Sequence, residues 1–143
     1  MKRALLDINV LVALLDLDHS HHQDARNWME RSADFGWASC PITENGCVRV
    51  MSQPAYPSPL PCSSVIARLT AATQTSYHEF WPDDISLLDQ SFVRGDRVHG
   101  PKQLTDIYLL ALAVKHSGRF ATFDGTVPIS AVSAAGQRHL VVL

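Results

Sequence analysis

Residues 3–15 read RALLDINVLVALL, an apolar stretch interrupted by one carboxylate, Asp7. The apolar run before this acid predicts a buried strand over residues 3–7, and the run after it predicts a short helix over 9–15. A charged side chain inside such a stretch is costly to bury unless something compensates it. A strand that ends on an acid and leads into a helix therefore indicates an α/β fold with a functional group at the strand end.

The rest of the chain alternates in the same way. Strands are predicted over residues 36–40, 76–81, 119–123 and 139–142, and helices over 20–33, 42–51, 63–75, 84–93 and 106–116. Pro41 opens the second of these helices, and Thr43 and Thr105 are the predicted N-caps. Residues 52–62 hold four prolines and predict an irregular loop. This alternation predicts one α/β domain over residues 1–143, with helices on both faces of a mostly parallel sheet of about five strands.

Three further acids occupy positions like that of Asp7. Glu44 and Asp106 lie in the first turns of predicted helices, and Asp124 follows the strand over 119–123. The carboxyl ends of parallel strands share one edge, where ligands bind in folds of this class. We therefore expect the four carboxylates to converge at that edge, although they are far apart in the sequence.

Clustered carboxylates repel one another and raise each other's pKa values unless a cation compensates them. Mg²⁺ and Mn²⁺ suit such a cluster because hard cations prefer oxygen ligands. A divalent cation can polarise a phosphoryl oxygen and activate water. The sequence holds no G-x-x-x-x-G-K-[ST] phosphate loop and no convincing Ser–His–Asp or Cys–His arrangement. Hydrolysis of a phosphodiester is the reaction that these residues favour.

The composition of the chain indicates where in the cell, and with what partners, this chemistry would take place. The chain is 46% hydrophobic and 18% charged, as globular proteins are, and its formal net charge is −2. Contact with RNA or DNA must then come from a local patch, because no overall positive field attracts nucleic acid. No apolar run is long enough to span a membrane, and no signal peptide is predicted. The three cysteines, Cys40, Cys47 and Cys62, lack zinc spacing and indicate thiols in a reducing cytoplasm.

Four segments of the chain carry a family resemblance: LLDINVLVALL, ITENGCVRVM, LTDIYLLALA and ATFDG. In this order and at these spacings they resemble the signature segments of PIN-domain nucleases, and more narrowly of the VapC toxins of VapBC toxin–antitoxin modules. The resemblance implies one PIN domain over residues 1–143. It also implies a Mg²⁺- or Mn²⁺-dependent endoribonuclease with an RNA substrate, acting as a homodimer in the prokaryotic cytoplasm. A cognate VapB-like antitoxin would hold it inactive.

The resemblance also assigns residues. Asp7, Glu44, Asp106 and Asp124 match the acidic positions that bind metal and support catalysis. Asn9 and Thr122 match polar positions beside them, where they would orient ligands or water. Ile8 departs from the small polar residue more common after the first Asp, and Cys47 replaces a bulkier apolar residue. Neither departure touches an acid.

Each acid also has a purely structural interpretation. Asp7 is a good helix cap, and acids such as Glu44 and Asp106 in a first helical turn are ordinary partners of the helix dipole. Asp124 precedes Gly125 in a common turn sequence. Glu44 and Asp106, taken singly, fit these structural roles better than a metal site. Asp7 alone favours metal binding over its structural role, because it lies inside an apolar strand; for the other three acids only the joint pattern favours function.

Other polar residues are ambiguous. The histidines His19, His21 and His22 are interpreted as solvated or capping groups rather than metal ligands. Arg94, Arg97 and Lys102 belong to a loop just before the helix of Asp106. This loop fits a solvated surface and an RNA-backbone contact equally well. Arg49 could pair with a site acid or form an external ion pair. The three tryptophans, Trp28, Trp37 and Trp81, fit a core better than a base-stacking platform.

Three other functions compete with the ribonuclease. A DNA-directed or structure-specific PIN nuclease usually needs insertions that 143 residues leave little room for. A Mg²⁺-binding phosphoacceptor signalling domain would need a lysine late in the chain, and none follows Lys115. A catalytically silent binding module would have no need of a complete acid set.

Overall fold

The computed structural model describes residues 2–143, which form a five-stranded sheet in the order β3-β2-β1-β4-β5. Every neighbouring pair of strands is parallel, so their carboxyl ends share one edge. The first strand in the sequence, β1, lies at the centre. The predicted parallel α/β fold is therefore confirmed. The strands are β1 (Ala4–Leu6), β2 (Trp37–Ser39), β3 (His78–Phe80), β4 (Arg119–Thr122) and β5 (Leu140–Val142).

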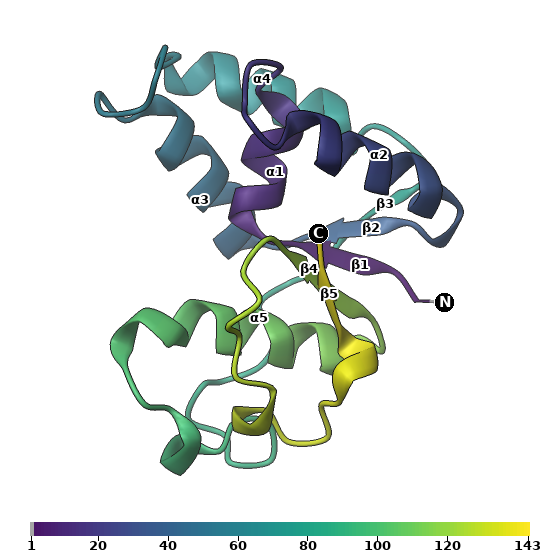
Figure 1. Cartoon of the computed structure of the whole chain (residues 1–143), viewed down its shortest axis with the longest axis vertical. Coiled ribbons are helices and arrows are strands. Elements are labelled where there is room, and N and C mark those ends of the chain that lie inside the picture. The colour runs from purple at the N-terminus through teal and green to yellow at the C-terminus, as the bar shows by residue number, and fades with distance from the viewer. Residues whose placement is uncertain (1) are drawn as a thin grey trace.

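Helices cover both faces of this sheet (Figure 1). The four on one side are α1 (Ile8–Leu15), α2 (His22–Ser32), α3 (Pro41–Ser52) and α4 (Cys62–Thr73), and α5 (Leu104–Lys115) lies on the other. Side chains alternate across β1: Leu5 packs in the cluster around α5, whereas Ala4 and Leu6 pack in the cluster around α1 and α3. Two cores therefore hold β1 from both faces.

The helix predicted over residues 84–93 is wrong. This segment consists of turns, in which the Ser86 hydroxyl accepts the Leu88 N–H and the Asp89 carboxylate accepts the Ser91 N–H. Short polar side chains that bond nearby backbone in this way compete with helical hydrogen bonds. Val93 then pairs with Val132 in an isolated antiparallel bridge.

Both predicted threonine caps are also wrong. Cys40 is the N-cap of α3, and Thr43 lies one turn inside, where its hydroxyl accepts the Cys40 N–H at 3.0 Å. α5 begins at Leu104 after a 3₁₀ turn over Pro101–Gln103, so Thr105 is already helical. Because Pro101 presets a helical φ, the helix starts earlier than the threonine suggested.

The close packing after α5 explains why residue 118 is a glycine. Ser117 adopts a left-handed conformation with φ 57°, and the Gly118 N–H donates to the Ala113 carbonyl at 2.8 Å. A Cβ on Gly118 would stand 2.6 Å from the Arg3 carbonyl oxygen and from the Trp81 ring. This close approach brings α5 directly onto β1 and β4.

The tryptophan prediction holds, because Trp28, Trp37 and Trp81 are all buried. Among residues 2–143, no helix is both long and apolar enough to cross a membrane.

Candidate functional site

Asp7 is a buried carboxylate held by two hydrogen bonds. It directly follows β1 and is the N-cap of α1, accepting the Ile8 N–H at 2.7 Å. Its other oxygen accepts the Thr122 hydroxyl at 2.6 Å, from the end of β4. Burial raises the pKa of Asp7 in spite of these donors, and the charge of Asp124 adds to the rise. Asp7 therefore caps a helix and also presents a fixed carboxylate at the sheet edge.

Asp106 and Asp124 lie close enough to Asp7 for their charges to interact. Burial and then the charges of Asp7 and Asp124 raise the pKa of Asp106 to about 6. Asp124 behaves oppositely: the hydroxyl and N–H of Thr126, at 2.6 and 2.8 Å, lower its pKa. In this carboxyl pair Asp124 ionises first, and Asp106 retains the proton. Three of the four predicted acids thus meet at the edge between β1 and β4.

Thr122 and Asn9 connect the elements around these acids. The Thr122 hydroxyl donates to Asp7 and accepts the Asp124 N–H at 3.0 Å. The Asn9 amide lies 3.4 Å from the same hydroxyl, and its oxygen lies 3.5 Å from the Phe123 nitrogen. α1 is in this way tied to the loop that carries Asp124.

Glu44 takes a different position. Its carboxylate accepts the Ser39 hydroxyl at 2.7 Å, and that hydroxyl lies 2.8 Å from His78 Nε2. Burial lowers the pKa of His78, with the charge of Glu44 opposing the shift. Glu44 is not among the charges that raise the pKa values of Asp7 and Asp106. The convergence predicted for four acids is therefore met by three, and Glu44 points to the end of β2.

The side chains alone do not form a ready metal cage. Within residues 2–143, no three His, Cys, Asp or Glu side chains are arranged to hold an ion by themselves. Mg²⁺ rarely needs such a cage, since it keeps several waters and takes one or two carboxylates plus substrate phosphate. A buried Asp7 and a half-buried Asp106 that repel one another, and that form no ion pair within residues 2–143, fit that requirement.

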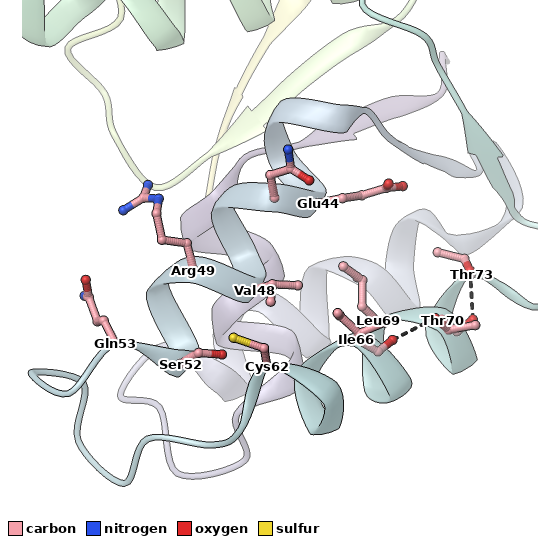
Figure 2. A pocket seen from close by; sticks show the side chains of 11 residues that line it. Glu44, Val48, Arg49, Ser52, Gln53, Cys62, Ile66, Leu69, Thr70 and Thr73 are labelled. Carbon is pink, nitrogen blue, oxygen red and sulfur yellow. Dashed lines mark hydrogen bonds between the residues drawn. The ribbon is translucent and has the colours of Figure 1, made fainter.

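An apolar groove of about 680 Å³ runs between α3 and α4, with Glu44 at its rim (Figure 2). Val48, Ile66 and Leu69 line it, and the Ile66 side chain is 52% exposed. Arg49 and Glu44 leave α3 in different directions (Figure 2). No ion pair involves Arg49 in the part of the chain that the structure describes.

The remaining predicted residues lie outside the acid cluster. Arg94, Arg97 and Lys102 are exposed on the loop before α5, where Arg97 stands 3.9 Å from Asp96. His22 Nδ1 lies 2.7 Å from the Ala13 carbonyl, in agreement with a capping histidine. The thiols of Cys40 and Cys47 are buried, which raises their pKa values to about 11 and about 12, whereas Cys62 is exposed.

Sequence reasoning missed Ser39, His78 and Thr126. Thr126 had a signal, because a threonine two residues after an aspartate commonly closes an Asp turn. Ser39 and His78 had none, since their contact with Glu44 depends on the pairing of β2 with β3.

Comparison with known proteins identifies the family of the chain. The PIN-domain family model matches residues 4–131. The chain is 55% identical to ribonuclease VapC44 of Mycobacterium tuberculosis over 99% of both chains. The chain belongs to the VapC family of PIN domains. VapC39 of the same organism is 41% identical, covering 90% of this chain and 93% of its own.

Solved structures show the same fold at low identity. M. tuberculosis VapC20, a toxin that cleaves the sarcin–ricin loop, superposes on this VapC-family chain with a TM-score of 0.61 at 12% identity. That match covers 93% of this chain and 99% of VapC20. VapBC2 from Rickettsia felis, solved with a DNA fragment of its promoter, gives 0.60 at 13% identity over 98% and 96% of the two chains.

Proposed function

We propose that this VapC-family chain is a toxin that hydrolyses RNA phosphodiester bonds with a divalent cation at the edge between β1 and β4. The observation that carries the proposal is the crowding of Asp7, Asp106 and Asp124, which raises the pKa of Asp106 to about 6. Among residues 2–143 no ion pair offsets this crowding, which suits a site that binds a cation. Family membership supports the ribonuclease activity, and the acid cluster supports its dependence on metal.

Asp7, Asp106 and Asp124 would hold Mg²⁺ or Mn²⁺, with Glu44 as a fourth carboxylate after turning away from Ser39. When bound, the cation supplies Lewis-acid polarisation of the phosphoryl oxygen and lowers the pKa of water. Asp7 is already oriented, because Ile8 and Thr122 fix both of its oxygens. Such preorganisation reduces the reorganisation that the reaction would otherwise need.

Asp106 and Asp124 have pKa values that are shifted in opposite directions. Thr126 keeps Asp124 ionised, so this carboxylate is available to a cation at neutral and mildly acidic pH. The pKa of Asp106, about 6, favours the protonated form below that pH, and a bound cation would favour the carboxylate form that could hold it. Asn9 and Thr122 would order ligands around the cation, because they already bridge α1 and β4.

The substrate backbone would contact the exposed loop before α5. Arg94, Arg97 and Lys102 are the exposed cations of this loop, which leads into the first turn of the helix that carries Asp106. Phosphate contacts of this kind position a strand without reading its sequence.

A cleavage assay tests the activity directly. Purified protein should cut single-stranded RNA with Mg²⁺ or Mn²⁺, lose the activity in EDTA, and regain it when excess metal is restored. Calorimetry should show metal binding that Asp7→Asn weakens. Cleavage that persists in EDTA would contradict the proposed metal site.

We also propose a cytoplasmic VapB-like antitoxin as partner, and a homodimer as the active assembly. The groove between α3 and α4 supports the first of these. Its walls are apolar and Glu44 is among its lining residues, so an apolar segment of the antitoxin seated there would contact this one of the four acids. A basic side chain on that segment could then reach the acids.

Co-expression tests the partner. Ile66→Asp should leave RNA cleavage in place but make growth inhibition resistant to relief by the antitoxin, because it puts a charge in the groove. Leu88→Asp is the matched control, as Leu88 is 88% exposed and outside the groove. Relief that is equally strong for both variants would place the antitoxin elsewhere.

A further inference from the structure

Three aromatic rings form a row beside the acid cluster. The rings of His21 and Phe123 are stacked, with centroids 4.8 Å apart and planes inclined at 30°. His19 continues the row, with its centroid 5.9 Å from that of His21. Phe123 directly precedes Asp124, and its N–H faces the Asn9 side chain. The row therefore joins the turn before α2 to the loop that carries a site acid.

Local structure explains only part of this row. His19 Nδ1 accepts the His21 N–H at 3.0 Å, which is an ordinary turn contact. That contact does not require the His21 side chain to lie on Phe123, and His21 remains 54% exposed there. Its one ionic neighbour, Asp24 at 3.6 Å, is itself 69% exposed. His21 thus presents a half-exposed ring that is held in place by its stacking on Phe123.

One ring of the row, His19, and one of the acids, Asp7, line the same cavity. It has a volume of about 310 Å³, at the lower end of the range for small-molecule sites, and Asp7, Asn9 and His19 are among its lining residues. Tyr56, from the proline-rich loop, lines the other side, and its hydroxyl donates to Asp16. A planar group in this cavity would have aromatic rings on its walls and a site carboxylate within the same space.

The charge of the protein indicates what such a group is. With a formal net charge of −2 and clustered aspartates, the protein repels the phosphate backbone of RNA overall. Stacking of bases on aromatic side chains supplies affinity that does not depend on net charge, and unpaired RNA is commonly held in this way. A site that cuts RNA would need this source of affinity close to the phosphodiester bond that it cuts.

We propose that the His19–His21–Phe123 row and the adjoining cavity form a subsite for unpaired bases next to the cleaved phosphodiester. This inference rests on the proposed ribonuclease function and specifies its substrate as RNA with unstacked bases at the cut. His21 is a binding residue that acts through its ring face, while the acids perform the chemistry.

Ring substitutions test the subsite. His21→Ala should raise KM for a short single-stranded RNA that the wild-type protein cleaves by about tenfold, with a much smaller change in kcat. His21→Phe keeps a ring but removes any charge, so its KM should lie close to the wild-type value. Tyr77→Ala is the control, because Tyr77 is exposed just before β3, at the opposite edge of the sheet. A His21→Phe variant as impaired as His21→Ala would overturn the proposal, since the contact would then be ionic.

Substrates lacking one base give an independent readout. An abasic ribose beside the cleaved bond should lower kcat/KM of the wild-type protein about tenfold, and the loss should nearly vanish in His21→Ala. Equal losses in both proteins would refute the subsite, although the protein would still be a ribonuclease. Failure of the wild-type protein to cleave any RNA with Mg²⁺ or Mn²⁺ would instead refute the proposed function itself.

Discussion

Acids at two places along the same sheet edge have different surroundings. At the end of β2, Glu44 accepts the Ser39 hydroxyl, and His78 stands behind that serine. At the ends of β1 and β4, three aspartates act on one another, and the pKa of Asp106 rises to about 6. The comparison teaches that an acid at a strand or helix end is not by itself a site. What matters is whether neighbouring strands supply donors that satisfy it.

The largest effect should follow from removing the most constrained acid. Asp7→Asn should lower metal-dependent RNA cleavage at least ~100-fold, because metal and preorganised charge contribute several kcal/mol to such reactions. Steady-state cleavage assays provide the measurement. Asp34→Asn is the control, since Asp34 is exposed and lies before β2, away from the acid edge. Equal losses of cleavage in Asp7→Asn and Asp34→Asn would show that the acid edge has no special role in the reaction.

Asp106 should show the cost of crowding in the metal-free protein. Its folded pKa, about 6, exceeds the ordinary 3.8, so the folded state binds a proton that the unfolded state releases. Its contribution therefore makes the protein less stable as pH rises through that window. In EDTA above pH 6, Asp106→Asn should be more stable than wild type by roughly 1–2 kcal/mol, and the difference should disappear near pH 4.

Urea titrations across that pH range measure this difference. Added Mg²⁺ should stabilise the wild-type protein more than the Asp106→Asn variant, because binding to the folded state adds to its stability. A metal-free variant that is less stable than wild type at pH 7 would show that the aspartates do not strain the fold.

Gly46 lies at the contact between the two regions. A Cβ there would stand 2.3 Å from Ile8 Cδ1, so in Gly46→Ala either the Ile8 side chain changes rotamer or α3 shifts relative to α1. Overpacking of this kind typically costs about 1–3 kcal/mol, here measured by denaturant unfolding. Ile8→Val in the same chain should recover part of the loss by removing the clashing methyl. If the double variant is no better than the sum of the two single ones, the clash is not the cause.

The smallest effect should come from the satisfied acid. Ser39→Ala removes the donor that holds Glu44 at β2, and it leaves Asp7, Asp106 and Asp124 untouched. If Glu44 turns to the cation during the reaction, the half-saturating Mg²⁺ concentration should fall by about twofold to fivefold, the worth of one hydrogen bond. An unchanged metal requirement would leave Glu44 as a structural group, and Glu44→Gln should then be nearly as active as wild type.

Much of the fold could be predicted because it rests on short-range patterns. The apolar run before Asp7 indicated β1, and the alternation of strands with helices indicated a parallel sheet. The segment over residues 84–93 could not be predicted, since Ser86 and Asp89 turn the backbone with side-chain hydrogen bonds that a helical spacing hides. The strands could thus be predicted from the sequence more reliably than the segments that connect them.

The acid cluster was predictable as far as topology determines it. Asp7 and Asp124 follow neighbouring strands, so their meeting needed only the strand order. The direction of Glu44 depends on one serine hydroxyl at the end of β2, and a sequence pattern does not contain the rotamer of a side chain. The Thr122 hydroxyl between Asp7 and Asp124 belongs to the same class of detail, although its position could be matched from the family segments.

The central place of β1 has a consequence for the cell that makes this protein. β1 pairs through Ala4–Leu6 with Arg119–Ala121, so the central strand completes its pairing only after a segment far later in the chain has been made. Asp7 and Asp124 cannot meet until the chain has been synthesised through Asp124. Pairing over such sequence distances is also slow. A nascent chain that ends before Asp124 would therefore lack a formed acid cluster, and the cluster would assemble only after β4 has been synthesised and has paired with β1.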